Sequence, residues 1–159
     1  MAPFNLNYFK RITSNKQYNV WHRCNVAYNY AEKRLKKIGQ GADRAVFRLD
    51  KTSVLKITID NIFQNEREVL VCKEYKNRRR ILTKVKDYNK DFIWIISEYA
   101  EPIKSNQRMA KADKSSLKAF GAFKFGESFY ADGIEISDVC WRNLGIYRGK
   151  LVFVDYGWD

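Results

Sequence analysis

Residues 38–59, IGQGADRAVFRLDKTSVLKITI, decide the fold. Two runs rich in β-branched and apolar residues, 45–49 and 53–59, are separated by three polar residues, and this pattern predicts an antiparallel β-hairpin. Lys56 stands among apolar neighbours in the second run. An ammonium that projects from such a strand needs an anionic partner, unless it reaches solvent from an edge strand. The stretch therefore predicts a hairpin that carries one cation in its second strand.

Apolar residues at helical spacing flank this hairpin on both sides. They recur from about residue 23 to 37, where the chain leads into Gly39, and again between residues 61 and 76. The segments 80–85 and 91–97 could then complete a sheet around the second helix. The expected order is helix, two strands, helix, two strands, which indicates an α+β fold with an antiparallel sheet.

The last third of the chain has a different pattern. Residues 107–118 are the most linker-like, and 115–120 is a candidate short helix. Two short apolar runs, 144–146 and 151–154, are separated by the turn Tyr147-Arg148-Gly149-Lys150. This predicts a tight hairpin that delivers Asp155-Tyr156-Gly157 at its end.

Composition sets further limits. The 159 residues carry 30 Lys and Arg against 18 Asp and Glu, a formal net charge of +12, with 45% hydrophobic residues and only 8 Gly and 2 Pro. One domain, or two small lobes around a cleft, is expected, and a disordered chain is excluded. The positive charge predicts attraction to polyanions without choosing among nucleic acid, nucleotide, acidic protein and anionic membrane.

The cysteines and the apolar runs indicate in which cellular compartment the protein is expected. Cys24, Cys72 and Cys140 are odd in number without a C-x-x-C pair, and His22 is the only histidine. Neither a disulfide framework nor a zinc site is expected. The longest apolar runs, such as 92–96, are too short for a membrane span, and the first ten residues lack a signal core. We therefore expect a cytoplasmic protein with no membrane partner.

Polar groups suited to phosphate binding occur in order along the first two thirds. Gly39 and Gly41 let backbone N–H groups approach phosphate oxygens, although a plain turn before a strand uses glycines too. Lys56 follows, and then Glu66 and Glu68, either of which could pair with it. Solvated helix positions would explain both glutamates equally well.

Two further groups complete the set. The segment 98–100 follows a buried-looking strand, so its backbone could hydrogen-bond a base. Asp138 and Asn143 lie five residues apart, and the predicted hairpin then delivers Asp155. Carboxylate and carboxamide oxygens converging at one end of a hairpin are the ligands that one or two Mg²⁺ ions require.

Taken together, these features resemble the protein kinase superfamily. Gly39-x-Gly41-x-x-Arg44-x-Val46 is similar to the glycine-rich loop, Lys56 to the strand lysine, and Glu68 (or Glu66) to its helix partner. Residues 97–100 look like the hinge, 138–143 like the catalytic loop, and Asp155-Tyr156-Gly157 like the metal-binding D-F-G motif. The resemblance is to compact kinase-like proteins of bacteriophages and bacteria, which would place the chain in a host cytoplasm if a phage encodes it.

The resemblance implies the division of labour and the partners. The cofactors would be ATP and Mg²⁺, and the reaction would transfer the γ-phosphoryl group to a hydroxyl of a protein. The resemblance implies that Asp138, Lys56 and Asn143 are catalytic residues and that Asn143 and Asp155 bind the metal. The residues implied to bind the nucleotide are Gly39, Gly41, Arg44, Val46, Lys56, Glu68, Glu98 and Ala100.

The resemblance also implies a domain plan. Residues 1–36 would be a helical extension, 37–100 an antiparallel-sheet N-lobe with one main helix, and 101–159 a truncated, mostly helical C-lobe that carries the catalytic-loop hairpin. Departures are Arg44 in place of a third glycine, Ile136-Ser137 in place of His-Arg, and the absence of an activation segment after residue 157.

Two alternatives stay open. The first is a kinase-like binding protein that docks on an acidic protein or a nucleic acid through the basic segment 67–90, whose charges could equally be a solvated surface. The second is a small nucleic-acid-binding protein in which Phe92, Trp94 and Tyr99 stack on bases. Aromatic residues in strands are usually buried, which favours a core position for them.

Overall fold

The computed structural model describes residues 3–74, 82–103, 129–131, 134–136 and 141–156. Helices and strands mix along the chain, and every strand pair formed by two named strands is antiparallel. This confirms the α+β class expected from the sequence. The elements are α1 (Leu6–Thr13), α2 (Val20–Glu32), β1 (Lys36–Gln40), β2 (Arg44–Arg48), β3 (Ser53–Thr58), α3 (Phe63–Glu74), β4 (Val85–Tyr88), β5 (Trp94–Glu98), β6 (Glu101–Pro102), β7 (Phe129–Ala131), β8 (Ile134–Ile136), the 3₁₀ turn η1 (Trp141–Asn143), β9 (Leu144–Tyr147) and β10 (Lys150–Phe153).

The main sheet has the strand order β1-β2-β3-β5-β4, so the lysine-bearing strand β3 lies at its centre. Side chains of a strand alternate between the two faces. Leu55 and Ile57 join the hydrophobic core formed with α1 and α2, whereas Lys56 lines a cavity on the opposite face. The alternative of an edge-strand lysine directed to solvent is therefore wrong, because Lys56 is buried in a central strand.

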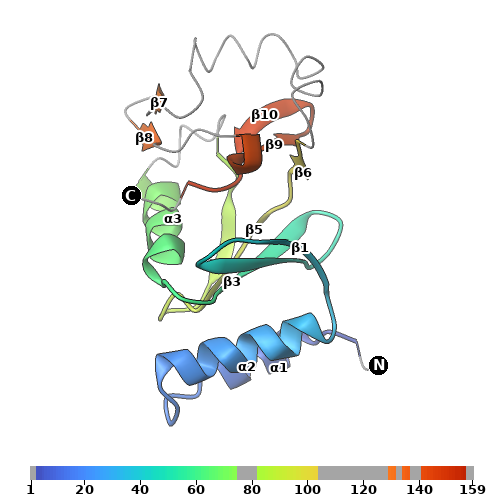
Figure 1. The fold of residues 1–159 in the computed structure, drawn as a ribbon, viewed down its shortest axis with the longest axis vertical. Coiled ribbons are helices and arrows are strands. Elements are labelled where there is room, and N and C mark those ends of the chain that lie inside the picture. Colours follow the sequence, from blue (N-terminus) through green and yellow to red (C-terminus); the bar gives the residue numbers. More distant parts are fainter. Residues whose placement is uncertain (1–2, 75–81, 104–128, 132–133, 137–140, 157–159) are drawn as a thin grey trace.

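The α1–α2 hairpin covers one face of this sheet. Phe9 of α1 and Cys24, Ala27 and Ala31 of α2 are fully or almost fully buried against Phe47 and the other core residues. The side chains of Asn5 and Asn19 accept hydrogen bonds from Tyr8 N and His22 N, and so cap the two helices. Figure 1 shows both helices at one end of the molecule, with the β9–β10 hairpin at the other.

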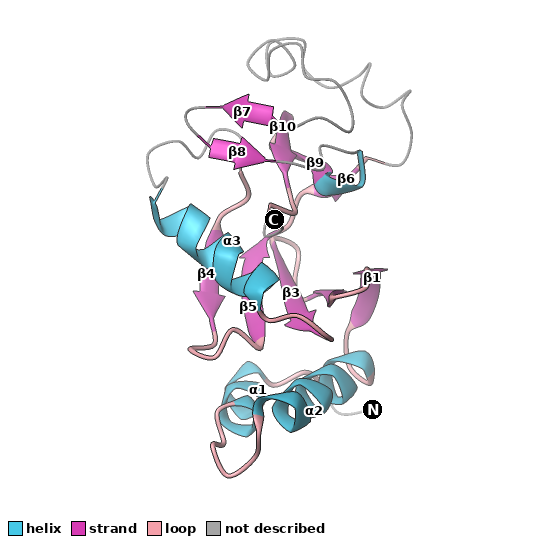
Figure 2. Cartoon of the chain, turned by 60° about the vertical axis from the view of Figure 1, so that its left-hand side comes forward, coloured by secondary structure: helices cyan, strands magenta, loops and turns pink. Residues whose placement is uncertain are grey.

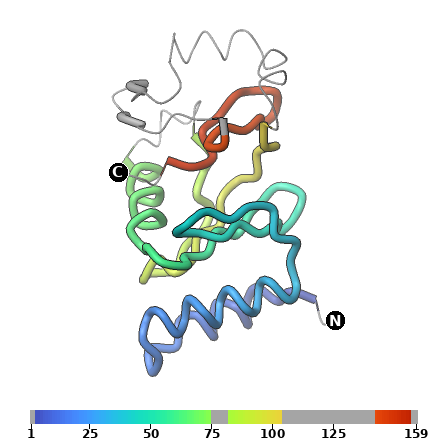
Figure 3. The backbone as a smooth tube through the Cα atoms, viewed as in Figure 1, coloured from blue at the N-terminus to red at the C-terminus, as the bar shows by residue number. Residues whose placement is uncertain are grey.

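Helix α3 and the C-terminal hairpin occupy the other side of the molecule. Figure 2 shows α3 lying across β4 and β5. A small second sheet has the order β10-β9-β6, and β6 follows β5 directly in the chain. The tube in Figure 3 can be followed from β5 into β6 beside the β9–β10 hairpin. The segment after β5 thus joins the two sheets.

The structure corrects two of the expected boundaries. Helix α2 ends at Glu32, whereas apolar spacing predicted a helix to Lys37, and Lys36 is already paired with Arg48 in the sheet. The fourth strand is β4 at Val85–Tyr88 and not 80–85. The hairpins β2–β3 and β9–β10 and helix α3 are confirmed.

Some expectations fall outside the described residues. The candidate helix at 115–120 and the linker-like segment at 107–118 are among them. From residue 101 onward, the described residues form short strands and one 3₁₀ turn. No helix in the described ranges has the length and apolar character that a bilayer crossing needs.

Cys24 offers a test of how the α1–α2 hairpin packs. Burial raises the pKa of its thiol to about 11, although nearby Arg23 opposes the shift. At pH 8 the native thiol should be protonated and enclosed, so alkylation by iodoacetamide should be much slower at Cys24 than at the half-buried Cys72. Peptide mapping by mass spectrometry after timed labelling measures both rates. Equal rates in native protein would contradict the packing, and equal rates in urea are the control.

Candidate functional site

Two strands and one helix bring a buried ion pair together. Nζ of Lys56 in β3 lies 2.5 Å from Oε1 of Glu68 in α3, and both side chains are almost inaccessible to solvent. Ser97 of β5 lies beside the same carboxylate oxygen, at 3.4 Å. Of the two glutamates left open by the sequence, Glu68 is therefore the one that contacts Lys56. The pair therefore joins α3 to β3, the central strand of the sheet.

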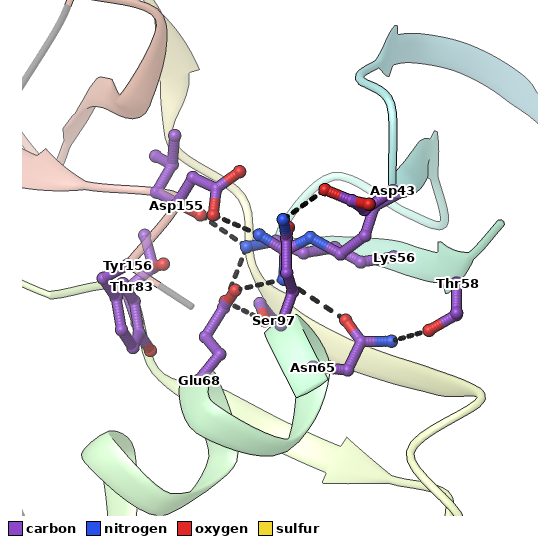
Figure 4. Close-up of polar contacts among 12 residues, drawn as sticks. Asp43, Lys56, Thr58, Asn65, Glu68, Thr83, Ser97, Asp155 and Tyr156 are labelled. Atoms are coloured by element: carbon purple, nitrogen blue, oxygen red, sulfur yellow. Dashed lines mark hydrogen bonds and ion pairs between the residues drawn. The ribbon is translucent and has the colours of Figure 1, made fainter. Parts of the chain in front are cut away.

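Arg44 bridges this pair to the C-terminal segment. Its Nη1 donates to Oε2 of Glu68 at 2.7 Å, and its Nη2 donates to Oδ1 of Asp155. The guanidinium is 4% exposed. The same Nη1 contacts Asn65 at 3.2 Å, and Asn65 in turn donates to Thr58 Oγ1 at 3.0 Å. Figure 4 shows the side chains of Lys56, Glu68 and Asp155 converging between the sheet, α3 and the C-terminal segment.

The four charged groups balance one another. Two cations, Arg44 and Lys56, face two carboxylates, Glu68 and Asp155. Burial lowers the pKa of Lys56, with Glu68 opposing the shift and Arg44 adding to it. Burial alone would also lower the pKa of Arg44, but the carboxylates of Glu68 and Asp155 outweigh it and raise that pKa above its usual range. Arg44 is therefore a permanent cation at the centre of the site.

The β9–β10 hairpin delivers Asp155 to this cluster. Asn143 precedes β9 and Val154 follows β10, and Val154 N donates to Asn143 O at 2.8 Å. Val154 O accepts from Nζ of Lys56. The hairpin therefore brings Asn143 and the segment of Asp155 to one end, next to the strand lysine. Tyr156 anchors the segment, because its hydroxyl donates to Thr83 O at 2.5 Å.

Gly145 allows three segments to meet at the cleft. A Cβ at this position would lie 2.8 Å from Ala100 Cβ and 2.8 Å from Val154 Cγ1, and 3.2 Å from Glu101 O. Real Cβ atoms do not approach other atoms so closely, so only glycine fits between the segment after β5 and the segment before Asp155. Gly39 in β1 and Gly41 in the β1–β2 turn are less constrained, since a Cβ at Gly39 would meet only Val46 Cβ, at 3.9 Å, and a Cβ at Gly41 nothing within 4 Å.

A cavity opens beside the charged cluster. Apolar atoms line most of it, with Val46 and Val54 from the sheet and Ala100 from the segment after β5. Its polar end holds Lys56 and Asp155, and the exposed Arg142 lies at its wall. An apolar chamber with a cation and a carboxylate at one end can hold a flat apolar ring and a charged tail together.

The structure brings together most of the residues that the sequence singled out. Gly39, Val46, Lys56, Glu98, Ala100 and Asp155 line the cavity. Glu68 and Arg44 lie behind Lys56 and Asp155 in the charged cluster, and Asn143 lies at the end of the same hairpin. Gly41 does not line the cavity. Asp138 lies outside the described residues.

The segment 98–100 is held on both sides. Glu98 N donates to Lys84 O and Tyr99 N to Thr52 O, each at 2.9 Å. The Glu98 carboxylate accepts hydrogen bonds from Lys84 N and from the Tyr147 hydroxyl, each at 3.0 Å. These contacts fix the backbone of the cavity wall.

The aromatic residues Phe92 and Trp94 do not form an exposed stacking face, because Trp94 is buried in the core and Phe92 is half-buried.

Asp155 is a carboxylate that lines the cavity and is a candidate metal ligand. Within the described residues, no group of three or more His, Cys, Asp or Glu side chains could hold a metal ion. Mg²⁺ commonly takes one or two protein carboxylates and completes its shell with phosphate and water oxygens. Asp155, whose side chain is 36% exposed, offers such a carboxylate, and the hairpin places the backbone of Asn143 next to that of Val154.

Sequence reasoning missed two features of the site. Arg44 was expected to contact the cofactor from a loop, and it is instead the first residue of β2 and buried in the charged cluster. The signal was present in the sequence as an arginine where the pattern expects a glycine. Gly145 carried no signal, because the atoms that crowd it come from Ala100 and Val154, and only the folded chain brings these together.

Comparisons with known proteins give one structural neighbour to report. No family model matches the chain, and no curated protein matches it. Among solved structures, the chain is similar to the ternary complex of APH(2")-IIa with streptomycin and ATP, with a TM-score of 0.39 and 12% identity. The match covers 76% of this chain and 37% of that chain, so this chain spans well under half of the neighbour's length.

Arg44→Met should destabilise the protein strongly. The variant leaves Asp155 without its guanidinium partner and Glu68 with one cation instead of two, and breaking a buried ion pair costs about 3–5 kcal/mol. Arg48→Met is the matched control, because Arg48 lies on the same strand, is only half-buried and forms no ion pair within the described residues, its contacts being the Lys51 carbonyl and the Tyr99 ring. Urea unfolding measures both. Equal free energies of unfolding for the two variants would show that the cluster does not hold the fold together.

Gly145→Ala should disturb the cleft. The added methyl group overlaps Ala100 and Val154, and overpacking of this kind typically costs about 1–3 kcal/mol. Gly41→Ala is the control, since its methyl group would enter open space. Thermal unfolding of the two variants gives the comparison. A Gly145→Ala protein as stable as Gly41→Ala would mean that β9 and Ala100 are farther apart than described.

Proposed function

We propose that the chain binds ATP with Mg²⁺ in this cavity and transfers the γ-phosphoryl group to a hydroxyl, as kinase-like phosphotransferases do. One observation carries the proposal. Lys56 and Asp155, which stand far apart in the sequence, line one cavity, and Glu68 holds the lysine from behind. An amine and a carboxylate at the polar end of an apolar chamber match a nucleotide with its metal-bound phosphates.

The walls of the cavity suit a nucleoside. Val46 and Val54 offer an apolar surface to a purine ring, and Glu98, Tyr99 and Ala100 line the same cavity. Contacts on both sides hold the backbone of Glu98 and Tyr99 in place, so its peptide groups could hydrogen-bond the edge of a base. Gly39 at the mouth leaves room for phosphate oxygens near the β1–β2 turn.

Lys56 would neutralise phosphate oxygens. Its position is fixed by Glu68 before any ligand arrives, so little reorganisation is needed at binding. Asp155 and Asn143 would hold the magnesium ion. The metal, when bound, supplies positive charge to the β- and γ-phosphate oxygens. Arg44 would hold the Asp155 carboxylate at the cavity through their ion pair.

The acceptor follows from the resemblance and not from the described contacts. We propose a hydroxyl group on a protein, oriented by Asp138, as the kinase-like pattern implies. The neighbouring structure contains streptomycin and ATP, so a small hydroxylated acceptor is the comparison to make experimentally. Both acceptors need the same positioning chemistry, because phosphoryl transfer requires only an aligned oxygen and charge neutralisation.

Two contacts inside the charged cluster favour a second function, that of a kinase-like binding protein. Arg44 donates to Asp155, and Lys56 donates to Val154 O, so both groups have partners within the chain. A kinase-like binding protein with weak or absent catalysis would retain this arrangement as a structural centre. Its docking segment would be the basic stretch 67–90, of which residues 75–81 lie outside the described part. Catalysis and mere nucleotide binding must therefore be measured separately.

Mg·ATP should raise the melting temperature of the wild-type protein, because a ligand that binds only the folded state stabilises it. Lys56→Met should abolish most of this shift. Asp155→Asn should reduce the shift with Mg·ATP more than the shift with ATP in EDTA, since only the former uses a metal ligand. Lys51→Met, an exposed lysine at the β2–β3 turn, is the matched control. A wild-type protein with no shift at millimolar Mg·ATP would overturn the nucleotide site.

Transfer of radiolabelled phosphate from [γ-³²P]ATP separates the two functions. We expect labelling of a mixed protein acceptor or an aminoglycoside by the wild type and none by Lys56→Met or Asp155→Asn. Labelling that survives both substitutions would reveal a contaminating kinase. Nucleotide binding without transfer to either acceptor would favour the binding protein.

A further inference from the structure

A second surface lies on the far side of the sheet from the cavity. Leu55 and Ile57 point into the core below α1 and α2, whereas Lys56 between them lines the cavity. The outer faces of α1 and α2 are therefore separated from the proposed nucleotide site by the sheet and its core. Figure 1 shows the two helices at the end of the molecule opposite β9 and β10. A ligand on these helices would not compete with one in the cavity.

The surface contains no acidic side chain over a long stretch. No Asp or Glu occurs before Glu32, and the exposed positions between residues 3 and 31 include Arg11 and Lys16 together with several asparagines. The cationic residues Lys10, Arg11, Lys16 and Arg23 therefore have no acidic residue among the first 31 positions of the chain. Such a surface attracts anions and offers amide groups for hydrogen bonds.

A groove runs between the end of α1 and the β4–β5 turn. Lys10, Lys16 and Lys90 are among the residues that line it, with Asn89 and Ser14. Its two carboxylates already have partners: Asp87 lies 2.5 Å from Lys10, and Asp91 lies 2.6 Å from Arg23.

The remaining lysines of the groove carry its net charge. Neither Lys16 nor Lys90 forms an ion pair with another of the described residues. Both side chains are exposed. The groove is therefore polar, positively charged and open to solvent.

Aromatic rings stand exposed on the same helices and on the segment that joins them. Tyr18 and Trp21 are each 49% exposed, and Tyr8 is 42% exposed. Tyr18 stacks on His22 with ring centroids 4.5 Å apart, and the Arg11 guanidinium lies 5.2 Å from the Tyr8 ring. Tyr18 and Tyr8 are thus each packed against a neighbouring side chain while remaining exposed. Rings held in this way are platforms on which a flat base can stack.

We propose that the α1–α2 surface, with the groove at the β4–β5 turn, binds single-stranded nucleic acid. Lysines along a groove contact phosphates, and exposed rings at the same end of the molecule stack on bases without reading sequence. This inference is independent of the nucleotide cavity. An anionic bilayer is a poorer partner, because the apolar side of α1 is turned into the core, with Phe9 fully buried, and cannot enter lipid. An acidic protein would use the lysines but has no need of the rings.

Fluorescence anisotropy with labelled U₁₂ RNA and dT₁₂ tests the proposal on the full chain. We expect wild-type binding at low salt that weakens with ionic strength, with a log–log slope of about −0.7 for each phosphate contacted. Lys16→Glu combined with Lys90→Glu should weaken binding about tenfold or more. Tyr18→Ala combined with Trp21→Ala should weaken it by a similar factor of about ten through loss of stacking.

Charge-matched and fold controls make the outcome decisive. Arg148→Glu combined with Lys150→Glu makes the same charge change at the exposed β9–β10 turn and should leave affinity within about twofold. Unchanged melting temperatures, and an unchanged response to Mg·ATP, show that all variants are folded. The proposal is overturned if wild type does not bind, if the control pair weakens binding as much as the lysine pair, or if the aromatic pair has no effect. It is also overturned if polyglutamate displaces the oligonucleotides at equal charge concentration.

Discussion

Glu68 is the residue on which the rest of the structure depends. Its two carboxylate oxygens accept from two cations on adjacent strands, Oε1 from Lys56 and Oε2 from Arg44. A buried charge without a partner is strongly destabilising, so each member of this cluster requires the others. Because Arg44 also binds Asp155, the requirement extends to the C-terminal segment. The sheet, α3 and the end of the β9–β10 hairpin are therefore stable only when assembled together.

Most of the main sheet and α3 could be predicted from the sequence for a simple reason. Alternation of apolar residues in 45–59 and helical spacing in 61–76 are local patterns, and the tertiary structure agrees with them. The end of α2 was misplaced because Leu35 continues the helical spacing, whereas pairing of Lys36 with Arg48 ends the helix sooner. All residues of strand β1 are exposed, so its sequence lacks the apolar alternation by which a strand can be predicted.

In the candidate site, too, local sequence patterns predict some residues, whereas others depend on contacts between distant segments. Lys56 and Asp155 were predictable because a charged residue beside apolar runs is conspicuous, and a tight hairpin delivers the second of them. The bridging role of Arg44 was not predictable from its position, because a long side chain beside a turn usually points to solvent. Its direction is decided by Glu68 and Asp155, which are distant in sequence. The crowding at Gly145 likewise depends on contacts between segments that only the fold brings together.

The charges of the buried cluster cancel one another, so attraction of an anion to this site has to come from other cations. The buried cluster contains two cations and two carboxylates, so it has no net charge and exerts little pull over distance. Arg142, exposed at the wall of the cavity, and the formal net charge of +12 of the whole chain provide that pull. In the proposed function, the neutral cluster would serve as a rigid set of charges that needs little rearrangement when phosphate oxygens reach Lys56. Attraction and positioning are thus separate tasks, the first belonging to exposed cations and the second to the buried residues around Glu68.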